Sequence, residues 1–207
     1  MYDKVRFLPS AISVAFLVIP SLIGNVLYAQ QSNLIVPEIK EISWGLYVDD
    51  PVNACWLMST PIPDRSKHIR DGAPRRVNRG AKDEKFPTAM LVGLDRSKET
   101  VKPFVTFTGG SYKFSLEEKH KTRFTLTVDG QEVFPMYPTI DPDGTYGARG
   151  WSYTYADQDV GAIKALRAGK EAKIVSVSSR GTVSTDYFSL IGFTAALEDM
   201  LKRCTLN

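Results

Sequence analysis

The sequence predicts a mainly β protein, an antiparallel β-sandwich or barrel with two short helices. About eight to ten short segments are rich in β-branched and aromatic residues, as strands are. Glycine, proline and aspartate turn signals separate these segments roughly every ten residues. Only two stretches, both near the C-terminus, have apolar residues at helical spacing. This alternation of short strands and turns is typical of sandwiches and barrels.

Residues 1–29 are predicted to be a secretory signal peptide. Lys4 and Arg6 precede a mostly apolar run from Phe7 to Val26, and a polar stretch follows Ala29. Two prolines interrupt the run, which leaves its uninterrupted part short for a membrane span of about 20 residues. We therefore expect cleavage between Ala29 and Gln30. An uncleaved N-terminal anchor is the alternative.

Cleavage would leave 178 residues (207 − 29), which is the size of one domain. The whole chain has a net charge of +3, and the leader holds two basic residues and one acid. The mature part is then +2, which argues against general nucleic-acid binding. It contains no other apolar run long enough to span a membrane. We predict a tether over residues 30–42 and a single β-sandwich domain over residues 43–207.

The first strands are predicted at Trp44 to Val48 and at Cys55 to Met58, from their aromatic and β-branched content. Asp49-Asp50-Pro51 ends the first strand, because the residue before proline favours a turn. Charges interleaved with apolar residues over 36–42 leave a weak edge strand possible within the tether.

Residues 64–85 are predicted to be an exposed excursion between strands and are the most basic part of the chain. Asp71-Gly72 is a strong turn pair within it. Arg75, Arg76 and Arg79 are the candidate contact surface for an anionic partner such as a sulfated glycan, an anionic lipid or an acidic protein. The alternative is a solvated loop whose acids cancel part of this charge.

The middle of the chain is predicted to form four strands, at residues 86–94, 101–108, 123–128 and 131–136. Asp129-Gly130 makes a two-residue hairpin between the last two. The proline- and glycine-rich stretch that follows Met136 and runs to Gly150 is predicted to be a loop.

The C-terminal part begins with alternating aromatic residues at Trp151, Tyr153 and Tyr155, as on a strand with one aromatic face. These rings suit stacking on a sugar, and sandwich core is the alternative. A short helix is predicted to begin at Asp157, which accepts from a free backbone amide, and to end at Gly169.

Three further elements complete the prediction. Strands are expected at Lys173 to Val177 and at Thr182 to Phe188, and a last helix from Phe193 to Arg203. Apolar residues at helical spacing are expected to face inward from the two helices: Val160, Ile163 and Leu166 from the first, and Leu197, Met200, Leu201 and Cys204 from the last.

Cys55 and Cys204 are the only two cysteines. In an exported chain they are most simply interpreted as one disulfide, which closes a loop of about 150 residues. Two free buried thiols are the alternative. A zinc site is not expected, since few other ligands remain.

An enzyme site is not expected. The two histidines, His68 and His120, lie among charges in predicted loops, and no Gly-x-Ser-x-Gly elbow occurs. Asp49 and Asp50 form a possible carboxylate pair, which leaves a secreted hydrolase open as an alternative. Turn formation explains the same two residues.

Several motifs resemble the invasion-associated locus B family, small exported proteins of Gram-negative bacteria. They are Trp44-Gly45-Leu46-Tyr47, Cys55-Trp56, Phe107-Thr108-Gly109-Gly110, Ser179-Arg180-Gly181-Thr182, the run from Phe188 to Leu197, and Arg203-Cys204. The resemblance covers nearly all of the mature chain, and differs most over residues 64–85 and 138–150.

The resemblance implies an immunoglobulin-like antiparallel β-sandwich in the periplasm or at the outer membrane, or secreted. In some pathogens the family is associated with entry into host cells. No catalytic residue and no cofactor is carried over from it. It implies a non-enzymatic envelope or binding protein, whose partner, a protein, a glycan or an envelope component, the sequence does not identify.

Overall fold

The structure is a computed structural model, and it describes residues 44–49, 54–75, 88–95, 102–110, 113–140 and 150–204. The chain divides into two units, Met1–Leu34 and Ile35–Asn207, and all of the described residues belong to the second. The predicted signal peptide, the Ala29–Gln30 bond and the tether over 30–42 lie outside the described residues.

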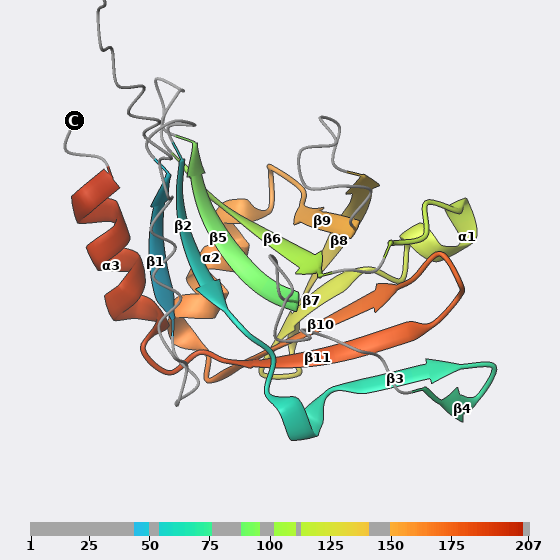
Figure 1. Cartoon of the computed structure of the whole chain (residues 1–207). Helices are drawn as coiled ribbons and strands as arrows, with labels where there is room; N and C mark the ends of the chain where they lie inside the picture. Colours follow the sequence, from blue (N-terminus) through green and yellow to red (C-terminus); the bar gives the residue numbers. More distant parts are fainter. Residues whose placement is uncertain are drawn as a thin grey trace, which may run out of the picture. The chain divides into compact units, whose positions relative to one another are not determined.

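The described part contains eleven strands, three α-helices and one 3-10 turn (Figure 1). In chain order they are β1 (Gly45–Asp49), β2 (Ala54–Ser59), η2 (Pro63–Arg65), β3 (Lys67–Arg70), β4 (Ala73–Pro74), β5 (Thr88–Asp95), β6 (Pro103–Gly109), α1 (Glu118–Lys121), β7 (Thr125–Val128), β8 (Glu132–Ile140), β9 (Gly150–Thr154), α2 (Asp159–Ala168), β10 (Glu171–Val177), β11 (Val183–Ser189) and α3 (Phe193–Cys204).

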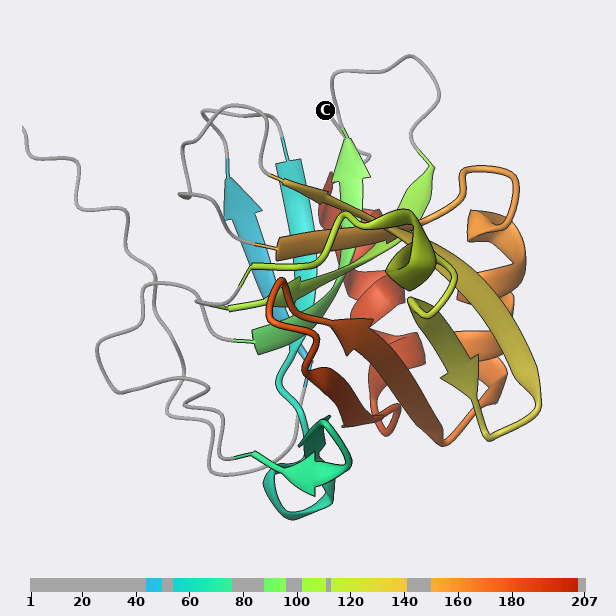
Figure 2. The same ribbon diagram turned by 90° about the vertical axis from the view of Figure 1, so that its right-hand side faces the viewer.

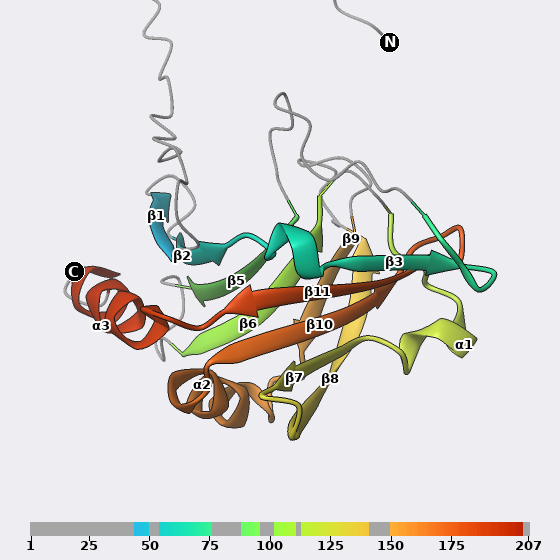
Figure 3. The same cartoon turned by 90° about the horizontal axis from the view of Figure 1, so that it is seen from below.

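All strand pairs are antiparallel, and they join in one continuous order: β1-β2-β5-β6-β9-β8-β7-β10-β11-β3-β4. The sheet is curled, as two views of it show (Figures 1 and 2). β8 belongs to both halves, because its first residues pair with β7 and its last ones with β9. We call β1-β2-β5-β6-β9 with the end of β8 the first half, and the start of β8 with β7-β10-β11-β3-β4 the second half (Figure 3).

β8 continues where the sequence predicted a loop. Pro135 is the last residue of β8 opposite β7, and Met136 is the first opposite β9. Proline lacks a backbone N–H and is tolerated where a ladder is interrupted or bends. Pro135 therefore marks the point at which β8 changes partner, and the strand runs on to Ile140.

The predicted excursion over 64–85 is partly regular structure. β3 and β4 form a hairpin whose turn has positive φ at both Asp71 (53°) and Gly72 (74°), and β3 pairs with β11. The sequence did not show this because the hairpin has few apolar residues and depends on a free edge of β11.

The core lies between the two halves. Phe107 of the first half lies edge-on to Phe188 of the second, with ring centroids 6.1 Å apart. Phe107 also contacts Phe114, which in turn contacts Phe124, so buried rings link one half to the other. The mainly β, antiparallel fold class is confirmed, with the two layers made by one curled sheet.

The helices differ from the prediction in three respects. α2 begins at Asp159, not Asp157, and its N-cap residue Gln158 makes no side-chain capping bond. Ile163 and Leu166 are buried as predicted, whereas Val160 is 71% exposed because it lies in the first turn on the outer side. The four-residue α1 was not predicted, since one helical turn has no measurable periodicity.

Candidate functional site

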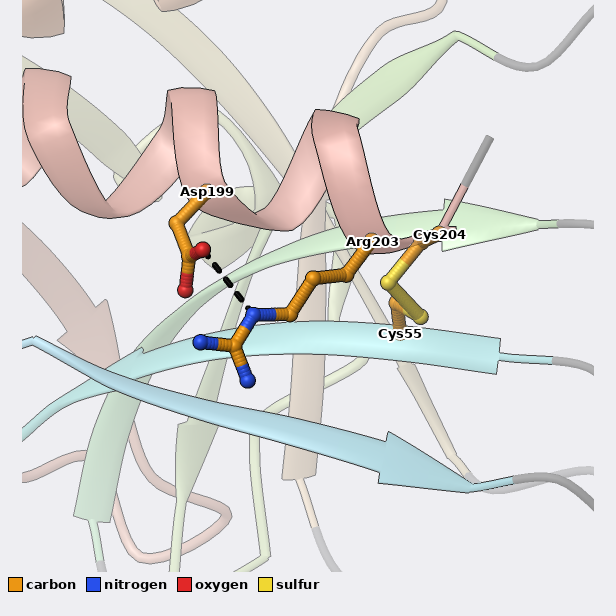
Figure 4. Close-up of a disulfide and its surroundings, with 4 residues drawn as sticks. All are labelled: Cys55, Asp199, Arg203 and Cys204. Atoms are coloured by element: carbon orange, nitrogen blue, oxygen red, sulfur yellow. Dashed lines mark hydrogen bonds and ion pairs between the residues drawn. A yellow bond between two sulfur atoms is a disulfide. The ribbon is translucent and has the colours of Figure 1, made fainter. Parts of the chain in front are cut away.

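Cys55 and Cys204 form a disulfide, as predicted (Figure 4). Their Cα atoms lie 6.4 Å apart across a sequence separation of 149 residues. Cys55 is fully buried on β2 and Cys204 is 3% exposed at the end of α3. The bond thus joins the last turn of the last helix to the second strand.

The start of α3 is fixed as well. The Trp44 ring lies 4.8 Å from the Phe193 ring, centroid to centroid, and its indole N–H donates to the Ser189 carbonyl at 3.1 Å. Buried Leu197 and Met200 line the inner face between these ends. α3 is therefore held at its start by Trp44 and at its end by the disulfide to β2, with its apolar face buried between them.

The predicted anionic-partner surface is described only in part. Arg75 is exposed directly after β4, and its backbone N–H donates to the His68 carbonyl at 2.8 Å. Arg76 and Arg79 lie outside the described residues, so this surface remains a prediction. In the strand order the hairpin that precedes Arg75 is at the opposite edge of the sheet from β1.

The two histidines each meet a buried serine. His68 Nδ1 lies 3.1 Å from Ser184 Oγ, and His120 Nδ1 lies 2.8 Å from Ser115 Oγ. Ser184 is 1% exposed and Ser115 is 2% exposed. A serine nucleophile must reach a substrate, so these pairs serve to tie β3 to β11 and α1 to the segment before it.

The structure does not describe the predicted carboxylate pair, Asp49 and Asp50, in full. Asp49 ends β1, but its side chain and the whole of Asp50 lie outside the described residues, so the carboxylate pair stays untested.

Among the described residues, no group of three or more His, Cys, Asp or Glu side chains is placed to hold a metal ion. Within the same part of the chain, no helix is long and apolar enough to cross a membrane.

Six aromatic side chains form a continuous row across the outer face of the first half, opposite the core. We call this set the aromatic row: Trp56, Phe104, Trp151, Tyr153, Tyr137 and Tyr155. Successive ring centroids lie 5.5 Å apart for Trp56–Phe104, 6.2 Å for Phe104–Tyr153, 5.7 Å for Tyr153–Tyr137, 5.1 Å for Tyr137–Tyr155 and 6.5 Å for the branch Trp151–Tyr153.

The register of the strands explains why the rings of the aromatic row lie together on the outer face. Side chains alternate between the two faces of a strand, and Cys55, Leu57 and Val105 point into the core while Trp56 and Phe104 point outward. Trp56 lies opposite Gly93, which lies opposite Phe104. Tyr153 lies directly opposite Tyr137.

Gly93 is required where the row crosses β5. A Cβ atom on Gly93 would lie 2.5 Å from the Trp56 ring and 2.5 Å from the Phe104 ring. Real Cβ atoms are not found this close to other atoms, so the two rings lie over the glycine backbone only because no side chain is present there.

Polar groups gather at one end of the row. Tyr137 is 39% and Tyr155 is 45% exposed. Burial, followed by the nearby Asp159 charge and Tyr155, raises the pKa of Tyr137. Burial also raises the pKa of the Asp159 carboxyl, although it accepts hydrogen bonds from the Thr154 hydroxyl and, at 3.4 Å, from the Val105 N–H.

The sequence identified only part of this surface. Trp151, Tyr153 and Tyr155 were singled out, with sandwich core as the alternative, and Trp151 and Tyr153 prove to be half-buried on the outer face. Trp56, Phe104 and Tyr137 join them from other strands. No local signal reveals this, although Tyr137 sits between two prolines in a stretch otherwise predicted to be a loop.

Of three comparisons with known proteins, one found a similar solved structure. No family model matches the chain, and no curated protein matches it. Among solved structures, the crystal structure of invasion associated protein B from Bartonella henselae is similar, with 17% identity over 71% of this chain and 92% of that chain, and a TM-score of 0.35. The motifs of this sequence resemble the same family, but at this identity and TM-score the similarity carries no argument about function.

Proposed function

We propose that the chain is an exported, non-enzymatic binding protein of the cell envelope that contacts its partner through the aromatic row. The observation that carries the proposal is the row itself. A strand-built domain normally buries large rings in its core, whereas in this domain six rings lie on the face opposite the core, two of them more than a third exposed. Exposed groups of large aromatic residues are typical of contact surfaces.

Export is supported by the disulfide and by the predicted leader. Disulfides persist in oxidising compartments such as the bacterial periplasm and are rare in the cytosol. The resemblance to the invasion-associated locus B family favours the periplasm or the outer membrane of a Gram-negative bacterium. In an organism that enters host cells, the same surface would serve host-cell contact.

A non-enzymatic role is favoured because the nucleophile-and-base residue types that the structure does bring together, His68 with Ser184 and His120 with Ser115, include serines that are out of reach of a substrate. The hydrolase alternative based on Asp49 and Asp50 is tested by activity screens of the wild type and of Asp49→Asn and Asp50→Asn. Turnover that falls in either variant would contradict a non-enzymatic role.

Export is tested by fractionating the native host and sequencing the N-terminus of the mature protein. We expect a start at Gln30 in the envelope or secreted fraction, with both cysteines resistant to alkylation until reduction. A chain that starts at Met1 in the cytosol with free thiols would contradict the proposal.

Binding is tested by immobilising the mature, oxidised protein and passing envelope extract and host-membrane extract over it. We expect retention of a specific component, and its loss with Tyr137→Ala or Tyr155→Ala. Equal retention by the wild type and by both variants would remove the aromatic row from the proposal.

A further inference from the structure

The aromatic row is most exposed at its Tyr137–Tyr155 end. Tyr155 is 45% and Tyr137 is 39% exposed, whereas Trp151 and Tyr153 are half-buried and stacked on each other. Tyr137 is stacked on Tyr153 at one side. The Tyr137 and Tyr155 rings are 5.1 Å apart and tilted by 52°, so neither lies flat on the other. Tyr155 is therefore the ring of the row that is most accessible to another molecule.

Two carboxylates stand beside this pair of rings. A turn closed by a 2.8 Å hydrogen bond from the Gln158 N–H to the Tyr155 carbonyl carries exposed Asp157, and Asp159 begins α2. Burial and then the Asp159 charge raise the pKa of Tyr137. Burial, with a smaller effect of the Asp157 charge, raises the pKa of Asp159. The two acids and Tyr137 are thus electrostatically close.

The Asp159 carboxylate has an oxygen that the described residues do not use. The Thr154 hydroxyl and the Val105 N–H both donate to the same atom, Asp159 Oδ1. Among the described residues, no group donates to Asp159 Oδ2, which is not sealed from solvent. The positive end of α2 explains why an acid is tolerated at this position, but it leaves Oδ2 open to a donor from another molecule.

The negative charge of this end is also not neutralised by a neighbouring cation. Within the part of the chain that the structure describes, five ion pairs are formed, and none of them includes Asp157 or Asp159. The mature chain as a whole has a net charge of +2, so these two acids form a local exception to its charge. Charge complementarity therefore favours a cationic group as the occupant.

The same chain shows which cation such residue types hold. On the second half, the Arg65 guanidinium lies over the Tyr187 ring, 4.4 Å from its centroid, and pairs with both carboxylate oxygens of Glu171. A tyrosine face and a carboxylate together position an arginine there. The Tyr137–Tyr155 end has tyrosine faces and carboxylates as well, and none of the described residues places a cation over these two rings.

We propose that the Tyr137–Tyr155 end of the aromatic row, together with Asp157 and Asp159, binds an arginine side chain of a partner protein. A guanidinium group is planar, stacks on an aromatic face and carries five N–H donors for carboxylate oxygens. The inference rests on the proposed binding role of this same surface. It specifies the chemistry of the partner, a protein segment that presents arginine.

Other occupants suit these groups less well. A quaternary ammonium group packs on tyrosine but has no N–H to donate to Asp159 Oδ2 or to Asp157. A lysine ammonium donates hydrogen bonds but has no planar face to stack on Tyr155. An anionic group would be repelled by the two carboxylates.

The experiment is an NMR titration of the mature, oxidised, isotope-labelled protein with the blocked peptide Gly-Arg-Gly-Arg-Gly. Matched peptides replace both arginines by lysine or by citrulline, the neutral isostere of arginine, and tetramethylammonium is the quaternary probe. We expect the arginine peptide to bind most tightly. The backbone amide signals between Tyr155 and Asp159 should shift the most.

Variants locate the contact. Tyr155→Leu and Asp157→Asn should each weaken binding of the arginine peptide about threefold, and together about tenfold, the scale of an exposed cation–π contact and an exposed ion pair. Tyr155→Phe keeps the aromatic face and should bind as the wild type does. Asp71→Asn in the β3–β4 turn is the matched control for loss of one exposed charge, because asparagine tolerates its positive φ, and it should leave binding unchanged.

Three results would overturn the inference. The first is that the arginine peptide does not bind, or binds no more tightly than the citrulline peptide. The second is that the lysine peptide or tetramethylammonium binds at least as tightly as the arginine peptide. The third is that Asp71→Asn weakens binding as much as Asp157→Asn does. If Tyr155→Ala abolishes capture of an envelope component while the arginine peptide does not bind, the proposed function stands and arginine is the wrong partner chemistry.

Discussion

At Asp159 a single half-buried carboxylate is subject to opposing influences. Burial disfavours its charged form, while the Thr154 hydroxyl and the Val105 N–H favour it by donating hydrogen bonds. Burial is the larger effect, so the pKa of Asp159 lies above its ordinary value of 3.8. The folded state is thus less stable when the Asp159 carboxyl is charged than when it is neutral.

The pH dependence of stability follows from this shift. Between the ordinary pKa and the raised one, the folded state binds more protons than the unfolded state, so the unfolding free energy falls as pH rises through this window. We expect Asp159→Asn to remove this fall, so that the variant gains stability relative to the wild type as pH rises above the ordinary pKa of 3.8. Urea unfolding at several pH values measures it.

Thr154→Val supplies the opposite test. It removes a hydrogen bond that favours the charged form, so the pKa of Asp159 should rise further and the pH-dependent window should widen. If both variants keep the pH profile of the wild type, Asp159 is not the group responsible.

Gly93 is the residue at which the row constrains the backbone. Gly93→Ala should lower the unfolding free energy by about 1–3 kcal/mol, because the new methyl group must displace the Trp56 and Phe104 rings. Thermal unfolding and tryptophan emission would report the two effects. Gly161→Ala in α2 is the control: a Cβ there meets only the Phe134 ring at 3.4 Å, and the change should be neutral or stabilise by up to about 1 kcal/mol.

At the scale of elements, Asp129 connects the β7–β8 hairpin to the start of β10. Its carboxylate accepts from the Lys170 N–H at 3.1 Å and from the Glu171 N–H at 3.0 Å. Its φ is +48°, and Gly130, which follows, has φ of +72°. One residue thus completes the turn and holds the segment between α2 and β10.

Substitutions separate these two roles. Asp129→Ala should lower the unfolding free energy by about 2 kcal/mol, because it loses the hydrogen bonds and adds left-handed backbone strain. Asp129→Gly loses only the bonds, and Asp129→Asn keeps one acceptor and tolerates the positive φ. The expected order of stability in chemical denaturation is Asn above Gly above Ala; an Ala variant as stable as the wild type would contradict it.

At the scale of the whole molecule, the disulfide closes nearly all of the described domain into one loop. Chain-entropy models give about 5 kcal/mol for a loop of 149 residues, a large fraction of the total stability of about 5–15 kcal/mol usual for a domain. α3 is also held at its start by the Trp44–Phe193 contact, so its native position does not depend on the bond alone.

We therefore expect the double variant Cys55→Ala/Cys204→Ala to fold with α3 in place but to lose about 2–5 kcal/mol of unfolding free energy. Alanine avoids placing a hydroxyl at two buried positions. Reduction of the wild type under native conditions should reproduce the loss. A double variant that matches the oxidised wild type in stability would show that the bond does not stabilise the domain.

Strand positions were largely predictable because each depends on nearby residues. β7, β10 and β11 follow from alternating apolar residues and from Asp129-Gly130 and the turn before Thr182, and α3 follows from the spacing of Leu197, Met200 and Cys204. The wrongly predicted segments are those whose structure depends on pairing with a strand that is distant in the sequence. β8 passes through two prolines because β9 is there to pair with it, and β3 forms because β11 offers a free edge.

By itself the sequence determined the fold class, most of the strands, the last helix and the pairing of its two cysteines, since these depend on local periodicity, turn residues and a count of two. Only the tertiary structure decided that six rings, five from four strands and Tyr155 from the residue after β9, lie side by side on an outer face. That result depends on strand order and register, which bring Trp56, Phe104, Tyr137 and Tyr153 together from positions up to 97 residues apart (153 − 56).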